Sequence, residues 1–193
     1  MKRTFETELP DGYSPAYEID AKNIKVGIVM NIIALLIAVI IVVPAWLIIK
    51  PVDFFGQYSL SRNILLVIVA FSYIVLHELT HGAAYKMLTH RKLTFGFTLS
   101  VAYCGVPDIY VYRNAALIAL LAPFAVFIPV FLIPALLMTG PWDKIYAFVM
   151  LGLHVGGCIG DLYDTFLYLF RFRSPDTLMR DTGPKQTFYI KNN

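Results

Sequence analysis

The sequence is poor in charge and in cysteine. Charged residues make up 15% of its 193 residues, against about 25% in soluble domains, and apolar residues reach 58%. A soluble domain of this length cannot bury so large an apolar fraction, which excludes a soluble enzyme. The net charge of +3 is too small to indicate nucleic-acid binding. Only Cys104 and Cys158 are present, so no disulfide framework is predicted.

The sequence contains long apolar segments with few charged residues. Crossing a bilayer takes about 20 helical residues, and four segments are long enough: from about Lys25 to Ile49, from Arg62 to near Lys86, from Asn114 to about Met138 and from Lys144 to Arg171. Residues 94–103 alternate apolar and polar side chains, and residues 108–112 follow a turn, which predicts a β-hairpin at about 93–112. The predicted fold is an all-α membrane protein of four transmembrane helices, with this hairpin between the second and third.

Lysine and arginine are unevenly distributed among the connecting segments. Thirteen of the sixteen lie before the first span, between the second and third spans, or after the fourth. Cytoplasmic segments carry such an excess, so both termini are expected in the cytoplasm. Residues 1–22 are polar and lack the short apolar core of a cleaved signal peptide, so the first span is expected to be kept. The expected organisation is a cytoplasmic tail at 1–24, a membrane domain at 25–171 and a cytoplasmic tail at 172–193.

The second span contains His77-Glu78-Leu79-Thr80-His81, an H-E-x-x-H motif. Residues four apart share one helix face, so both imidazoles can reach the same metal ion. Two neutral nitrogens suit Zn²⁺, which takes a third protein ligand and keeps a fourth position for water. Glu78 can accept a proton from that zinc-bound water and return it to the leaving amine. Ionisable groups in a membrane helix cost about 2.5–3.5 kcal/mol each, which favours a functional role.

The third zinc ligand must come from elsewhere in the chain. No glutamate follows Glu78, and the position six residues after His81 is Met87, so two common zincin patterns do not apply. His90 lies beyond the span, in the basic connection. The remaining candidates lie in the fourth span: His154, Cys158, Asp161 and Asp164.

Depth in the membrane separates these candidates. At about 1.5 Å per residue, the motif histidines lie about 22 and 28 Å into the second span, and Asp161 lies about 26 Å into the fourth. Cys158 at about 21 Å and Asp164 at about 30 Å lie near the edges of this range, and His154 is shallower at about 15 Å. Asp161 is the predicted third ligand. Asp164 is the second choice, or a partner that orients a histidine.

The motif within a span, the following strand segment and the later intramembrane aspartate resemble intramembrane metalloproteases of the site-2-protease type. From about Ile64 to Ile190 the chain is also similar to the putative zincin peptidase family of small bacterial membrane proteins. The similar segments are His77–His81, Leu121–Pro123, Gly160-Asp161 and Asp181–Gly183. The resemblance implies a zinc peptidase within a bacterial cytoplasmic membrane. Site-2 proteases have glycine after the aspartate, whereas here Leu162 follows Asp161.

The sequence therefore predicts a membrane-embedded zinc metalloendopeptidase that cuts a protein substrate at or near the cytoplasmic face. One Zn²⁺ is held by His77, His81 and Asp161, and Glu78 activates the water. The expected partners are the lipid bilayer and a membrane or membrane-associated protein, with no nucleic acid. The hairpin either holds an extended substrate by its strand edge or only packs on the helices. The alternative function is a metal-binding or metal-transporting membrane protein, in which Glu78 has no obvious role.

Overall fold

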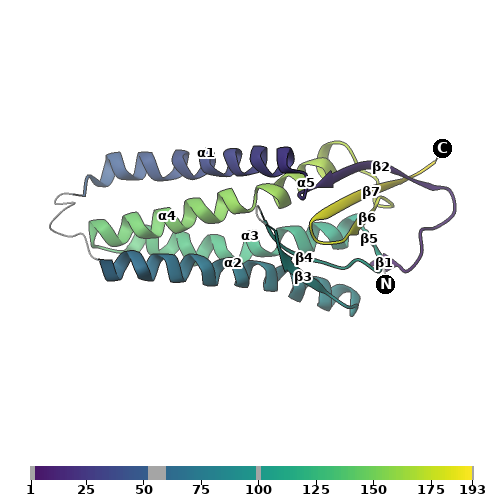
Figure 1. Ribbon diagram of the computed structural model, residues 1–193, viewed down its shortest axis with the longest axis horizontal. Helices are drawn as coiled ribbons and strands as arrows, with labels where there is room; N and C mark the ends of the chain where they lie inside the picture. The colour runs from purple at the N-terminus through teal and green to yellow at the C-terminus, as the bar shows by residue number, and fades with distance from the viewer. Residues whose placement is uncertain (1–2, 52–59, 99–100, 193) are drawn as a thin grey trace.

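The computed structural model describes residues 3–51, 60–98 and 101–192. Long helices lie side by side and join a β-sheet at one end (Figure 1). The described helices are α1 (Ile24–Ile49), α2 (Leu60–Thr89), α3 (Arg113–Leu137), α4 (Pro141–Gly157) and α5 (Ile159–Phe170). The described strands are β1 (Phe5–Glu6), β2 (Tyr13–Asp20), β3 (Thr94–Phe97), β4 (Ala102–Gly105), β5 (Tyr110–Tyr112), β6 (Leu178–Asp181) and β7 (Lys185–Lys191).

Three helices, α1, α2 and α3, are long and apolar enough to cross a membrane. α1 and α2 expose many large apolar side chains, such as Leu36 at 55% and Phe71 at 69%. Continuous exposed apolar surface of this kind indicates contact with lipid or with another protein. The predicted fourth span is broken, because α4 and α5 meet at Cys158 with a bend of 47°.

The prediction of an all-α protein with four membrane helices is wrong. The end segments, predicted as tails, supply four strands of a five-stranded antiparallel sheet, whose order is β1-β5-β6-β7-β2. In that sheet Tyr13 pairs with Lys191. A pairing between residues so far apart in the sequence cannot be predicted from a local pattern. β2 also contains Pro15, beside a register shift, and proline argues against a strand unless the strand lies at a sheet edge. β2 is such an edge strand.

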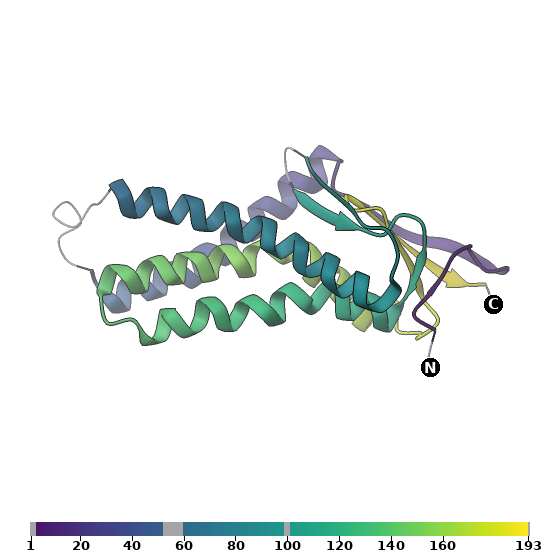
Figure 2. The same cartoon turned by 90° about the horizontal axis from the view of Figure 1, so that it is seen from below.

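The hairpin between α2 and α3 is shorter than predicted. β3 and β4 pair from Thr94 with Gly105 to Phe97 with Ala102, so the predicted single strand at 94–103 falls on two different strands. Residues 99–100 of that predicted strand lie outside the described residues. β5, predicted as the returning strand, instead pairs with β1 and β6 in the large sheet. Figures 1 and 2 both place the hairpin at the joint between helices and sheet.

A hydrophobic core fills the space between the sheet and the adjoining ends of α2, α3 and α5. Its fully buried side chains include Tyr85 of α2, Tyr168 of α5 and Phe188 of β7. The rings of Phe172 and Phe188 stack at 5.0 Å between centroids. This core holds the inner ends of the three helices against the sheet, and it borders the site described next.

Candidate metal centre

α2 carries a row of buried polar side chains on its inward face. His77 and His81 are one helical turn apart and each is 7% exposed. Their Nε2 atoms lie 3.2 Å from each other. Tyr73 lies one turn before them and Tyr85 one turn after, and both are buried. The four-residue spacing from position 73 to position 85 places all four side chains along one side of the helix.

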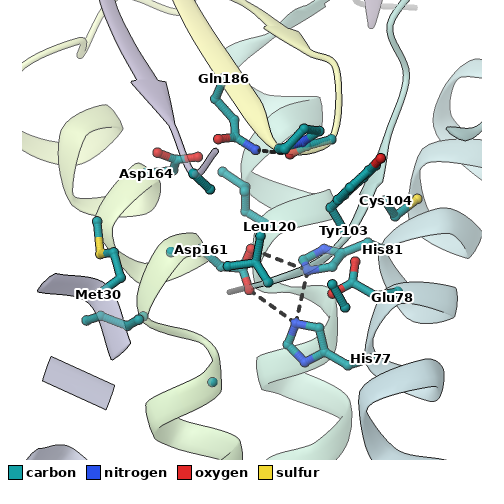
Figure 3. Close-up of a pocket in the computed structure, with 18 of the residues that line it drawn as sticks. Met30, His77, Glu78, His81, Tyr103, Cys104, Leu120, Asp161, Asp164 and Gln186 are labelled. Atoms are coloured by element: carbon teal, nitrogen blue, oxygen red, sulfur yellow. Dashed lines mark hydrogen bonds and ion pairs between the residues drawn. The ribbon is translucent and has the colours of Figure 1, made fainter. Parts of the chain in front are cut away.

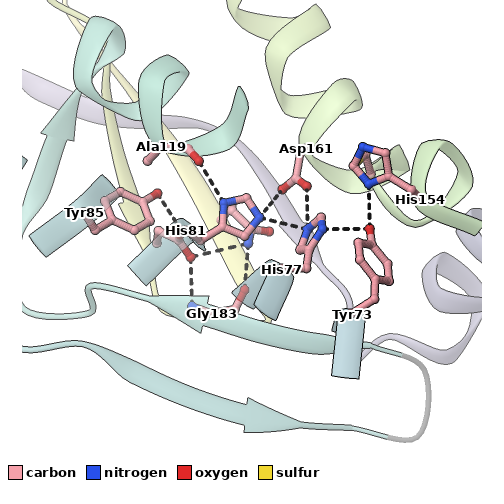
Figure 4. A network of polar contacts seen from close by, with 11 residues as sticks. Tyr73, His77, His81, Tyr85, Ala119, His154, Asp161 and Gly183 are labelled. Carbon is pink, nitrogen blue, oxygen red and sulfur yellow. Dashed lines mark hydrogen bonds and ion pairs between the residues drawn. The ribbon is translucent and has the colours of Figure 1, made fainter. Parts of the chain in front are cut away.

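Asp161 reaches these histidines from α5. Its Oδ2 atom lies 3.3 Å from His77 Nε2 and its Oδ1 atom 3.3 Å from His81 Nε2 (Figures 3 and 4). The residue lies in the first turn of α5, directly after the bend at Cys158. The structure thus brings together the three side chains predicted as zinc ligands, on two helices about 80 residues apart in sequence.

Hydrogen bonds on the far side of each ring orient the two histidines. His81 Nδ1 lies 2.8 Å from the Ala119 carbonyl oxygen, which can only accept, so Nδ1 carries the proton and a neutral His81 turns the Nε2 lone pair toward Asp161. His77 Nδ1 lies 3.0 Å from the Tyr73 hydroxyl, and that hydroxyl lies 2.8 Å from His154 Nδ1. With His77 Nδ1 donating to Tyr73 and Tyr73 donating to His154, the Nε2 of His77 is also free to bind a cation.

The arrangement fits a zinc ion. Two imidazole nitrogens that act as acceptors and a carboxylate at this separation can surround a cation. Tetrahedral zinc with bonds of about 2.0–2.1 Å has ligand atoms about 3.3 Å apart, and the three described separations are 3.2–3.3 Å. Two imidazoles and one carboxylate leave a fourth position open, which is the pattern of catalytic rather than structural zinc sites.

A second group of potential donors lies behind His77. His77, His154 and Cys158 have donor atoms within 4.8 Å of one another. His154 and Cys158 are fully buried, and neither belongs to the described residues that line the adjacent cavity. The Tyr73 hydroxyl occupies Nδ1 of both histidines. We therefore assign this group to the support of His77 rather than to a metal site that substrate can reach.

A cavity of about 300 Å³ opens beside the three predicted ligands (Figure 3). α1, α2, β4, α5 and the turn between β6 and β7 contribute to its lining. Glu78 lines it together with the predicted ligands, and no hydrogen bond to its carboxylate is found within the described parts of the chain. The predicted base therefore borders the same space as the predicted metal ligands.

Asp164 also lines the cavity, but it does not lie where either role predicted for it would place it. It is not part of either group of potential metal donors found in the described residues. It does not orient a histidine, because Tyr73 and the Ala119 carbonyl occupy the two Nδ1 atoms.

Asp181, which the sequence analysis named only within the family-like segment Asp181–Gly183, is a buried carboxyl in the cavity wall. Asp181 accepts hydrogen bonds from the Tyr85 hydroxyl at 2.8 Å, the Gly183 amide at 2.9 Å and the Gln186 side chain at 3.4 Å. These bonds tie the β6–β7 turn to α2. Tyr73 and Tyr85 were missed as site residues, and their four-residue spacing from the motif is the signal that could have found them.

Asp181 is expected to make stability depend on pH. Burial raises its pKa to about 6, although the bonds from Gly183 and Tyr85 oppose the shift. The unfolded carboxyl has a pKa of about 3.9, so the folded state binds the proton more tightly and the free energy of unfolding falls as pH rises through about 4 to 6. From pH 5 to pH 8 the loss is about 1.4 kcal/mol. Asp181→Asn has no such titration.

The measurement is the apparent unfolding temperature of detergent-solubilised protein between pH 5 and pH 8. The difference between Asp181→Asn and the unchanged protein should grow in favour of the variant as pH rises. A difference that stays constant across this range would show that Asp181 is ionised in the folded state at both ends.

Comparison with known proteins agrees with this site. Residues 70–175, more than half of the chain, match the family described as "Putative zincin peptidase". No curated protein and no solved structure matches the chain. The matched residues include both histidines, Glu78 and Asp161. Zincins bind zinc through an H-E-x-x-H helix, and the chain belongs to the putative zincin peptidase family.

Proposed function

We propose that this protein is a membrane-embedded zinc endopeptidase of the site-2-protease type, which hydrolyses a peptide bond of a protein substrate at or near the cytoplasmic face. The observation that carries the proposal is the triangle of His77, His81 and Asp161 beside a cavity that Glu78 also lines. A carboxylate that binds no described partner, next to a predicted metal ligand, favours hydrolysis over metal storage or transport.

Each residue then has a defined task. Zinc, when bound to the two imidazoles and Asp161, would polarise the scissile carbonyl and lower the pKa of water toward 7. Glu78 takes a proton from the attacking water and passes it to the nitrogen of the leaving group. The C–N bond then breaks to release a neutral amine instead of an amide anion. The Ala119 carbonyl and the Tyr73 hydroxyl hold the two rings in the required orientation. β4 lies along the cavity, where an extended substrate can pair with its edge.

Apolar helices support the membrane location. α1, α2 and α3 are long enough to span, and the motif lies in the second half of α2, nearer the sheet. Both termini lie at the sheet end (Figure 1). The excess of lysine and arginine in the segments at that end supports a cytoplasmic sheet. A reporter that is active only outside the cytoplasm, fused after Asn193, should stay silent, and strong activity would reverse the orientation.

The function is tested by identifying the new N-termini that cleavage by this protein creates in other proteins of the cell. Membrane proteins of a bacterial strain expressing the unchanged protein are compared with those of a strain expressing Glu78→Gln. New N-termini within or next to apolar segments should occur only with the unchanged protein. Glu18→Gln is the matched control, because Glu18 is half-exposed in an ion pair with Lys185 and is not among the described residues that line the cavity. If no terminus depends on Glu78, the endopeptidase proposal is wrong.

A further inference from the structure

The cavity beside the predicted metal ligands is acidic. Four carboxyl groups line it, from Glu78, Asp161, Asp164 and Asp181, and none of the described lining residues is lysine or arginine. Three of the four have an assigned task. Asp161 faces the histidines, Asp181 accepts three hydrogen bonds, and Glu78 is the proposed base. Asp164 remains without one.

Asp164 is a buried carboxyl that lacks a hydrogen-bond donor. It is 4% exposed, and within the described residues no hydrogen bond or ion pair reaches its oxygens. A mostly buried carboxyl without a protein donor is costly unless something else supplies the hydrogen bond. It also lines the cavity, so a ligand in the cavity can supply the donor that the protein does not.

Asp164 and Gln186 line the part of the cavity nearer the sheet. Asp164 lies one turn beyond Asp161 on α5, and Figure 3 shows Asp164 and Gln186 on the sheet side of Asp161. Gln186 donates its side-chain amide to Asp181 and to the Gly183 carbonyl, which leaves its side-chain oxygen as a second acceptor. The cavity lining also includes apolar side chains, among them Val26, Met30 and Ile74.

We propose that Asp164, assisted by the Gln186 oxygen, is a specificity subsite for a lysine or arginine side chain of the substrate, next to the bond that is cut. The inference rests on the proposed peptidase function and names its substrate class: an apolar segment followed by a basic residue. The cytoplasmic ends of membrane helices have this pattern. A long basic side chain can lay its methylene stem along the apolar wall and place its charge on Asp164.

The test measures binding and cleavage separately. Full-length Glu78→Gln protein, loaded with zinc in lipid nanodiscs, is titrated against fluorescent peptides made of an alanine-leucine segment of about 20 residues. A single lysine is moved through the segment, and each peptide has a twin with glutamine at that place. Fluorescence anisotropy gives Kd for each pair. The protein with Glu78 intact is assayed for kcat/KM on the same peptides.

At one register, lysine is expected to bind about 10- to 100-fold more tightly than glutamine. Asp164→Asn should abolish this preference for lysine. The same variant should leave the Kd of the glutamine peptide and the zinc content unchanged. Asp164→Glu should keep most of the preference. Asp143→Asn is the matched control, since Asp143 is an aspartate of α4 outside the cavity that lies 3.8 Å from Arg62.

Several results would overturn the subsite. These are equal binding of lysine and glutamine peptides at every register, a lysine preference that survives Asp164→Asn, or loss of zinc in that variant. The first needs no Asp164 variant, so it holds even if Asp164→Asn fails to fold. If binding follows Asp164 but no peptide is cut by the protein with Glu78 intact, the subsite stands and the peptidase function fails.

Discussion

Purified Glu78→Gln protein is expected to bind one zinc ion per chain and to cleave its substrate about 10²- to 10⁴-fold more slowly than the unchanged protein. Glutamine has nearly the shape of glutamate, but it cannot accept the proton of the attacking water. Zinc should be retained, because the described group of possible donors consists of His77, His81 and Asp161 and does not include Glu78. Zinc is counted by metal analysis, and the rate is measured on a peptide that contains the cleavage site found in cells.

The surface variant Glu18→Gln provides the comparison for this experiment, because it removes the same charge from an exposed ion pair with Lys185. Its rate and its zinc content should equal those of the unchanged protein. Full activity in Glu78→Gln would disprove the base mechanism. Loss of zinc from the same variant would instead make Glu78 a ligand.

Asp161→Ala is expected to lower zinc affinity by more than about a hundredfold, which exceeds the 10- to 100-fold loss typical of a partner outside the ligand set. The carboxylate closes the triangle, with one oxygen 3.3 Å from each histidine nitrogen. Without it the site has two neutral donors and no negative charge to balance the ion. Affinity is measured by competition with a chromophoric chelator.

Asp164→Ala is the matched control, since it removes a second aspartate one turn along the same helix. Its zinc affinity should fall little, because Asp164 belongs to no described donor group. A larger loss of zinc affinity in Asp164→Ala than in Asp161→Ala would identify Asp164, one turn further along α5, as the third ligand. Unchanged affinity in both would direct attention to the second group, with His154 and Cys158.

The depth argument from sequence selected Asp161 although it assumed a continuous fourth span. The span is bent by 47° at Cys158, yet Asp161 lies beside both histidines. The bend comes only three residues before Asp161, so most of the helix up to that point has the regular rise that the depth estimate assumes. The choice between Asp161 and Asp164, one turn apart, depends on where the helix starts again, and only the structure shows that.

Features carried by neighbouring residues could be read from the sequence alone. Helical hydrogen bonds join residues four apart, so the pairing of His77 with His81 on one face of α2 and the apolar length of α1, α2 and α3 follow from local spacing. The sheet, the bend at Cys158 and the contact between Asp181 and Tyr85 were decided by tertiary structure. Strands such as β2 and β7 join residues about 170 positions apart, and they form because together they bury one core against the helix ends. That shared burial belongs to no single segment, so no segment's composition or periodicity reveals it.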